Sequence, residues 1–207
     1  KHQLYRLIAS YVIRREICGL SAKNYNNVFA EMAGALNKNG ASVKSFKEAF
    51  LAKSESAAAR FPSDKDVEDA IRSRAVYWTV QQRRLRLLLE ELEFAWRNKF
   101  EVDGPLPHGL SVEHVMPQGW LEYWPLPDGR KLPKDGLPTD EAMRVALETR
   151  NRALHTLGNL TLLTPPANAS AGNAAFKDKK ERLRKSLLSM NSWIADVPDE
   201  DWAEEKG

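Results

Sequence analysis

The residues best suited to chemistry are an adjacent acid and base, Glu113 and His114, followed by two asparagines, Asn159 and Asn168, that stand nine residues apart. A histidine near its ordinary pKa of about 6.5 is a good general base at neutral pH. Carboxylate and amide oxygens suit a hard cation such as Mg²⁺, which takes few protein ligands and keeps several waters. Together these groups could activate a water and hold a cation, as the hydrolysis of a phosphodiester requires.

The adjacency of the acid and the base sets a geometric condition on such a site. Glu113 and His114 lie in a short β-prone run that ends at Met116-Pro117. Neighbouring residues of a strand point to opposite faces of the sheet. The two side chains can therefore serve one site only if the end of the strand is twisted or curled.

The elements that must position these groups are short strands set among helices. We expect a second strand over residues 157–163 and a basic helix over 173–189. The Pro/Gly-rich stretch 124–133 is expected to be an inserted surface loop. After it, Thr139 is expected to cap a helix that runs to about Thr149.

The first hundred residues predict a helical scaffold. Leu4, Ile8, Tyr11 and Val12 form one apolar stripe at helical spacing, and Gly19 is expected to end that helix. Further helices are expected over about 22–36, 45–56, from Ser63 onward, and over 78–97, where the apolar pattern is strongest.

Composition divides the chain into three parts. The Gly/Pro-rich run 103–107 predicts a boundary between a helical region, 1–103, and a second domain, 104–190. The last part, 191–207, is expected to be an acidic tail, because its only basic residue is Lys206. The remainder of the chain is mildly basic, which weakly favours a polyanionic partner. The expected fold class is mainly α with a small β-hairpin.

Composition also excludes several classes of protein. The chain has no run of about 18 apolar residues, the length that a membrane helix needs, and it shows no signal peptide. A single cysteine, Cys18, excludes an internal disulfide and a cysteine-rich zinc site. One unpaired cysteine fits a reducing compartment, and we expect a cytoplasmic protein with no membrane partner. Because Lys1 is not an initiator methionine, we interpret the chain as a piece of a longer protein.

The motifs together resemble a known family. The chain is similar to the C-terminal HNH (ββα-metal) nuclease domain of GmrSD-type modification-dependent restriction endonucleases, a group that includes SspE-like defence proteins. Three blocks that appear in order carry the resemblance: Glu113 to Gln118 with Trp120; His155 to Leu163; and Asn168 with Asn173, Phe176 and Lys177. Segments 11–19 and 61–64 of the helical half also look like the part that precedes the nuclease motif in those proteins.

The resemblance implies a role for each residue of the motif. It makes His114 the general base and Glu113 a metal ligand. It makes Asn159 the residue that braces the loop holding His114. Asn168 becomes the second metal ligand, supplied from the end of a helix, and Asn173 is the alternative for that position. The expected fold is accordingly a helical N-terminal region followed by a ββα-metal core.

Two departures from the common HNH pattern bear on the metal. Many HNH sites have aspartate where Glu113 stands, and many end in histidine where Asn168 stands. An amide oxygen in place of imidazole shifts the preference towards Mg²⁺ or Mn²⁺. The resemblance also implies an upstream nucleotide-hydrolysing sensor domain in the whole protein. No phosphate-binding loop of the Gly-x-x-x-x-Gly-Lys type occurs in this sequence.

Other polar and aromatic residues allow more than one interpretation. Lys177, Lys180 and Arg184 share a helical face with Asn173 and are candidates for contacts to DNA phosphates, although a solvated face is nearly as good an interpretation.

Two aromatic and two histidine positions are also open to alternatives. Trp120 and Trp124 could stack on bases, but a role in pinning a loop to the core is the safer expectation. His108 and His155 are expected to be a solvated residue and a hydrogen-bonded loop residue, and neither is assigned a direct role in the site.

The function expected from the resemblance is metal-dependent cleavage or nicking of DNA, as the effector part of a bacterial anti-phage restriction system. The alternative is a non-catalytic module that binds nucleic acid or another partner and retains the ββα scaffold.

Overall fold

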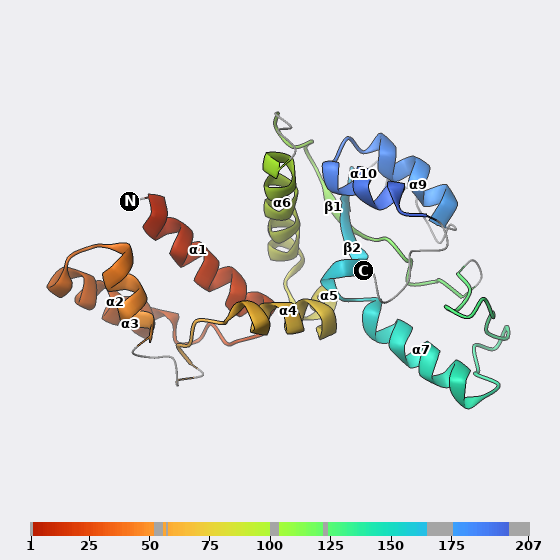
Figure 1. Ribbon diagram of the computed structural model, residues 1–207, viewed down its shortest axis with the longest axis horizontal. Coiled ribbons are helices and arrows are strands. Elements are labelled where there is room, and N and C mark those ends of the chain that lie inside the picture. The colour runs from red at the N-terminus through yellow and green to blue at the C-terminus, as the bar shows by residue number, and fades with distance from the viewer. Residues whose placement is uncertain are drawn as a thin grey trace. The chain divides into compact units, whose positions relative to one another are not determined.

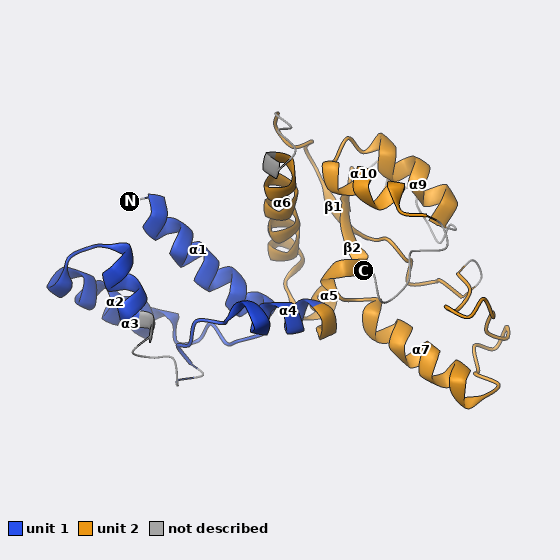
Figure 2. Cartoon of the chain, in the orientation of Figure 1, with its two compact units in different colours: residues 1–71 blue, residues 72–207 orange. Residues whose placement is uncertain are grey.

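The computed structural model describes residues 2–51, 56, 58–99, 104–121, 124–164 and 176–198. Within these ranges the protein is mainly helical and contains a two-stranded antiparallel sheet (Figure 1). The expectation of a mainly α protein with a small β element is confirmed. The chain divides into two compact units, residues 1–71 and 72–207 (Figure 2).

The first unit contains helices α1 (His2–Ile17), α2 (Tyr25–Asn39) and α3 (Val43–Leu51) and most of α4 (Asp64–Ser73). Its core is built on Tyr11, Val28, Met32, Phe46 and Ala59. Gly19 ends α1 as expected: it has a φ of 67°, a left-handed conformation that glycine adopts without strain.

The second unit contains the remaining elements. They are α5 (Val76–Thr79), α6 (Gln82–Lys99), β1 (Ser111–His114), α7 (Glu141–Ala153), the 3₁₀ turn η1 (Leu157–Asn159), β2 (Leu160–Leu163), α9 (Phe176–Lys185) and α10 (Ser189–Asp196). The compact units divide at residue 71, whereas composition led us to expect a boundary near residue 103. The difference arises because α6 packs against β1, β2 and α10, so this helix belongs with the sheet.

The sheet pairs the two segments that carry the first two motif blocks. β1 and β2 run antiparallel, with Ser111 opposite Leu163 and His114 opposite Leu160. All four residues of β2 are buried. The strand β2 is therefore buried along its whole length, and its Leu160 pairs with His114, the last residue of β1.

The segment after Met116 is fixed to α7 rather than lying free on the surface. Trp120 and Trp124 are 3% and 6% exposed, as the loop-pinning interpretation requires. The guanidinium of Arg150 lies 4.6 Å from the centre of the Trp120 ring and donates hydrogen bonds to the carbonyls of Trp124 and Pro125. Leu126, within the expected surface loop, is 2% exposed because its side chain joins the core.

The start of α10 is capped by a carboxylate from far upstream. Glu93 of α6 is fully buried and accepts hydrogen bonds from the backbone N–H groups of Ser189 (2.8 Å) and Met190 (2.9 Å). The same carboxylate pairs with Arg97 at 2.7 Å. A carboxylate at a helix N-terminus satisfies its free N–H groups and interacts favourably with the helix dipole. Residues 191–196 thus form part of this packed unit, where composition had led us to expect a tail from 191 onward.

Candidate active site

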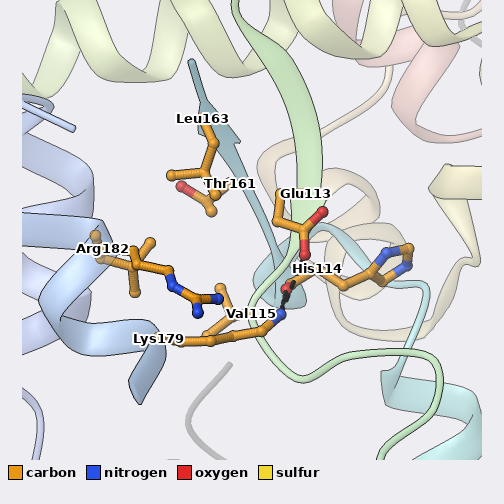
Figure 3. Close-up of a pocket in the computed structure, with 8 residues that line it drawn as sticks. Glu113, His114, Val115, Thr161, Leu163, Lys179 and Arg182 are labelled. Carbon is orange, nitrogen blue, oxygen red and sulfur yellow. Dashed lines mark hydrogen bonds and ion pairs between the residues drawn. The ribbon is translucent and has the colours of Figure 1, made fainter. Parts of the chain in front are cut away.

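At the end of β1, the side chains of Glu113 and His114 contact different neighbours. Glu113 Oε1 lies 3.1 Å from the ammonium nitrogen of Lys179 on α9. The ring of His114 instead packs on Tyr77, with 4.3 Å between the ring centres. Figure 3 shows the imidazole directed away from Lys179. The alternation expected of a strand is therefore kept, and the Glu113 carboxylate and the His114 imidazole face different surroundings.

His114 is held in a buried, aromatic environment. Its side chain is 5% exposed, and its Nε2 lies 3.2 Å from Nδ1 of His155. Burial lowers the pKa of His114 from 6.5 to about 4, with further lowering by the charges of His155 and Lys179. The imidazole is therefore neutral at physiological pH, the form in which a histidine can accept a proton.

His155 contributes to the site although sequence reasoning gave it no such role. Besides its contact with His114, its ring stacks on Tyr77 with 5.8 Å between ring centres. Its carbonyl also accepts a hydrogen bond from the Tyr77 N–H. Burial lowers the pKa of His155 below the usual value for histidine. Tyr77 and His155 together fix the orientation of the His114 ring.

Asn159 ties the loop after His114 to the turn that precedes β2. Its Oδ1 accepts a hydrogen bond from Met116 N at 2.8 Å, and its Nδ2 donates to the carbonyls of Met116 (3.0 Å) and Leu154 (2.8 Å). Its own carbonyl accepts from Val115 N at 2.9 Å. The residue is 5% exposed. These contacts are the ones expected of a residue that braces the loop. None of them gives Asn159 a direct part in a reaction.

Lys179 is a second residue of the site that the sequence did not indicate. It is 3% exposed, and its ammonium group donates to the carbonyl of His114 at 2.7 Å as well as to Glu113. Burial lowers the pKa of Lys179, and the nearby Glu113 carboxylate opposes that shift. A buried lysine is stable only when its charge is paired. Lys179 therefore links α9 to β1 next to the candidate base.

A pocket lies at this junction of α9 with the two strands. Its lining is formed by Glu113, His114, Val115, Thr161, Leu163, Lys179, Arg182 and Leu183. In Figure 3 the side chains of Lys179 and Arg182 both reach from α9 towards β1. Glu113 and the two cationic residues of α9 thus border the same space, whereas the His114 imidazole faces Tyr77 and His155.

The basic residues expected to contact DNA lie differently on α9. Lys177 is exposed, as a phosphate contact requires. The ammonium of Lys180 lies 4.8 Å from the centre of the Phe176 ring. Arg184 donates to the carbonyl of Ala195 at 2.8 Å and is 3.5 Å from Asp196, so it also holds α10. The described part of the basic helix is α9, Phe176–Lys185, and the expected start at residue 173 lies outside the described residues.

Both candidates for the second metal ligand, Asn168 and Asn173, lie outside the described residues. Among the residues that the structure does describe, there is no group of three or more histidine, cysteine, aspartate or glutamate side chains placed to hold a metal ion. Glu113 is the expected ligand that the structure describes. Its Oε1 accepts a hydrogen bond from Lys179, and its Oε2 has no such contact in the described part of the chain. One carboxylate oxygen is compatible with Mg²⁺, which is held by one or two carboxylates together with phosphate oxygens and waters.

Comparison with known proteins identifies a family. The sequence model described as the C-terminal domain of GmrSD restriction endonucleases matches residues 61–206. No curated protein and no solved structure gives a significant match. None of the helices in the described ranges is both long enough and apolar enough to cross a membrane.

Proposed function

The chain belongs to the family of C-terminal domains of GmrSD restriction endonucleases, and from that membership we propose that it is a metal-dependent DNA endonuclease or nickase domain with a ββα-metal core. The observation that carries the proposal is the position of Asn159, whose side chain binds the loop that follows His114. The resemblance assigns this bracing contact to the middle residue of an HNH motif. The order β1, β2, α9, with Lys179 joining the helix to β1, is compatible with such a core.

In this proposal His114 accepts the proton of the attacking water. Its Nε2 is occupied by the contact with His155. Base catalysis therefore requires the tautomer in which His114 Nε2–H donates to His155 Nδ1 and His114 Nδ1 keeps its lone pair. Tyr77 and His155 hold the ring in that orientation, and burial keeps it neutral.

Glu113 is the described residue that would hold a cation, with Asn168 or Asn173 as the second protein ligand. A bound Mg²⁺ or Mn²⁺ would supply stabilisation of negative charge on the phosphate and on the leaving oxygen. Lys177, Lys180 and Arg184 remain our candidates for contacts with DNA phosphates along α9. Recognition of a DNA modification we assign to an upstream nucleotide-hydrolysing domain of the whole protein.

The experiment that tests the proposal is nicking of supercoiled plasmid by the purified chain in Mg²⁺, Mn²⁺ or EDTA. We expect slow, sequence-independent nicking that requires the metal. The rate should fall steeply as salt rises, because a few phosphate contacts give salt-dependent binding. Failure to nick in any divalent metal would refute the proposal.

One set of contacts favours a second candidate, a non-catalytic nucleic-acid-binding module. Lys179 engages the Glu113 carboxylate, and His155 engages His114, so both candidate functional groups already have protein partners. In a non-catalytic module these contacts would be purely structural. Metal-independent DNA binding by the wild-type chain without any nicking is the result that would favour this alternative.

A further inference from the structure

Trp78 of α5 is open to solvent, although tryptophan is highly buried on average in folded proteins. It is 63% exposed. The ring is nonetheless held in place, because it packs on Tyr77 with 4.9 Å between ring centres and on His155 with 5.0 Å. An aromatic ring that is fixed on one side and open on the other is suited to stacking on a planar ligand.

The Trp78 ring is the outermost member of the aromatic group that surrounds the candidate base. Next to it lies His155, which is partly buried, and beyond His155 lies His114, which is 5% exposed. Tyr77 packs on all three of these rings. A ligand stacked on Trp78 would therefore lie on the solvent side of the group that holds His114.

The sequence around Trp78 is strongly basic. Between Asp69 and Glu90 there is no acidic residue, and there are five arginines: Arg72, Arg74, Arg83, Arg84 and Arg86. Arg86 pairs with Glu90 at 3.3 Å. The exposed arginines are Arg72, Arg83 and Arg84. Positive charge gathered in this way favours a polyanionic partner.

Hydrogen bonds place several of these arginines beside Trp78. The guanidinium of Arg74 donates to the hydroxyl of Thr79 at 3.2 Å. The side chain of Gln82 donates to the carbonyl of Tyr77 at 2.9 Å, so the first turn of α6 is held against α5 (Figure 1). That turn carries the two exposed arginines of α6, which therefore lie near the exposed ring.

An exposed indole beside arginines is the combination that binds a single nucleic-acid strand. Arginines bind the backbone phosphates, and the ring stacks on a base of any sequence. In a duplex both faces of each base are covered by the neighbouring base pairs, so an exposed ring can stack only where a base is unpaired. The surroundings of Trp78 therefore favour a single strand or a locally opened duplex.

We propose that Trp78 stacks on an unpaired base of DNA while Arg83 and Arg84 bind phosphates of the same strand. The strand then passes the solvent side of His155, next to the group that holds the candidate base. The preferred substrate is accordingly DNA with unpaired bases. The choice of DNA as the nucleic acid rests on the proposed function, whereas the stacking contact rests on the exposure and packing of Trp78.

The test measures DNA binding in EDTA, where the proposed reaction cannot proceed. Fluorescence anisotropy is recorded with a labelled single strand of mixed sequence and with a duplex of the same sequence. We expect Trp78→Ala to weaken binding of the single strand roughly tenfold and to leave binding of the duplex unchanged. Trp78→Phe keeps a flat ring and should retain most of the affinity. Trp193→Ala is the matched control, because Trp193 is 46% exposed and packs on Trp96, about 20 Å along α6 from its start.

The salt dependence separates stacking from phosphate contacts. Trp78→Ala should leave the slope of log affinity against log salt unchanged, because the ring carries no charge. Arg83→Gln should reduce that slope by about 0.7 for the single strand, the effect of one lost phosphate contact. Arg6→Gln, at an exposed position of α1 in the first unit, is the control for the loss of an arginine.

Three results would overturn the inference. They are no binding of the single strand by the wild type, wild-type affinity in Trp78→Ala, and an equal loss for single strand and duplex, which would mean that the ring only supports the local fold. Should Trp78→Ala not fold, photo-crosslinking of the wild type to a single strand that contains 5-iodouracil gives the answer. We expect the crosslink at Trp78, and crosslinks confined to other residues would contradict the stacking contact.

The outcomes also separate this inference from the proposed nuclease activity. If the wild type does not nick DNA but Trp78→Ala selectively loses the single strand, the stacking contact stands and the nuclease proposal fails. If the wild type nicks DNA and Trp78→Ala binds the single strand as the wild type does, the inference fails and the nuclease proposal stands. A Trp78→Ala protein that loses self-association without any change in DNA binding would assign the ring to a protein contact and refute the inference.

Discussion

Nε2 of His114 lies 3.2 Å from Nδ1 of His155, so the two histidines share one hydrogen bond at the end of β1. One of these nitrogens must donate and the other accept, so the two rings cannot both be protonated while the bond persists. The charge of His155 accordingly contributes to lowering the pKa of His114. The contact thus couples the ionisation of His114 to the orientation of its ring.

We expect His155→Ala to lower the rate of DNA cleavage by roughly 10- to 100-fold, the usual effect of removing a residue that orients a functional side chain. The pKa of His114 should also rise, since the variant exposes its ring and removes a neighbouring positive charge. The acid limb of the pH–rate profile should therefore move to higher pH. A variant with the wild-type rate and the wild-type acid limb would show that His155 does not orient the base.

Because the pKa of His114 is depressed in the folded protein, we predict that the protein becomes less stable as the pH is lowered. The ring titrates near 6.5 in the unfolded chain and at about 4 in the folded protein. Between these values the unfolded state binds more protons, so the free energy of unfolding decreases as pH falls. A shift of this size corresponds to about 3 kcal/mol, reached by about pH 4.

Urea denaturation at pH 7 and pH 5 measures this effect in the wild type and in His114→Ala. The loss of stability should be smaller in the variant, where the lowered pKa values of His155 and of carboxylates such as Asp140 still act in this direction. Equal losses in the two proteins would show that the folded state does not depress the pKa of His114.

Asn159→Ala should destabilise the second unit and reduce cleavage together. The substitution removes three side-chain hydrogen bonds and leaves the N–H and carbonyl of Met116 and the carbonyl of Leu154 unsatisfied in a buried place. We expect the free energy of unfolding to drop by about 3 kcal/mol. Asn151→Ala, at an exposed position of α7, is the matched control and should change stability little. If Asn159→Ala kept full stability and activity, the bracing role would have to be abandoned.

Glu93→Ala should detach α10 from the second unit. The change leaves Arg97 without its buried carboxylate and removes the acceptor of the first N–H groups of α10 at Ser189 and Met190. Breaking a buried pair from one side costs about 3–5 kcal/mol. Hydrogen exchange over residues 189–196 should therefore accelerate, while Glu90→Ala, next to it in α6, should have a much smaller effect. Unchanged protection of α10 would contradict the capping role of Glu93.

The larger elements could be predicted from local pattern alone. The apolar stripe of α1, its end at Gly19, and the strong pattern of α6 each follow from residues close together in the sequence. The position of β1 also followed from a short run of β-prone residues. Of the second strand expected over 157–163, only Leu160–Leu163 is a strand, because residues 157–159 form the 3₁₀ turn η1. The position of Asn159 agrees with the role that the family resemblance implies for it.

The contacts of α9 could not be predicted, because they depend on which face of the helix is buried. From the sequence we expected a helix from residue 173 whose functional face carries Lys177, Lys180 and Arg184. The observed buried face instead contains Phe176, Lys179 and Leu183. The spacing of Phe176 and Leu183 by seven residues was the available signal, since it places position 179 on the same apolar face. A lysine at such a position needs a buried partner.

Contacts between residues far apart in the sequence could not be predicted either. Glu93 lies 96 residues before the helix it caps, and nothing near it in sequence indicates that role. The acidic composition of the last residues also gave no indication that Ile194 and Ala195 of α10 are buried. The contact between His114 and His155 likewise joins residues 41 apart.

We propose that His114 is the general base of a metal-dependent nuclease. The most direct measurement compares nicking of supercoiled plasmid in Mg²⁺ by the wild type, His114→Ala and His108→Ala. His108 is the control because it is exposed and precedes β1 in the same segment. Loss of the base should slow nicking by roughly 10²- to 10⁴-fold, with His108→Ala unaffected. A His114→Ala protein that folds and nicks DNA at the wild-type rate would contradict the account.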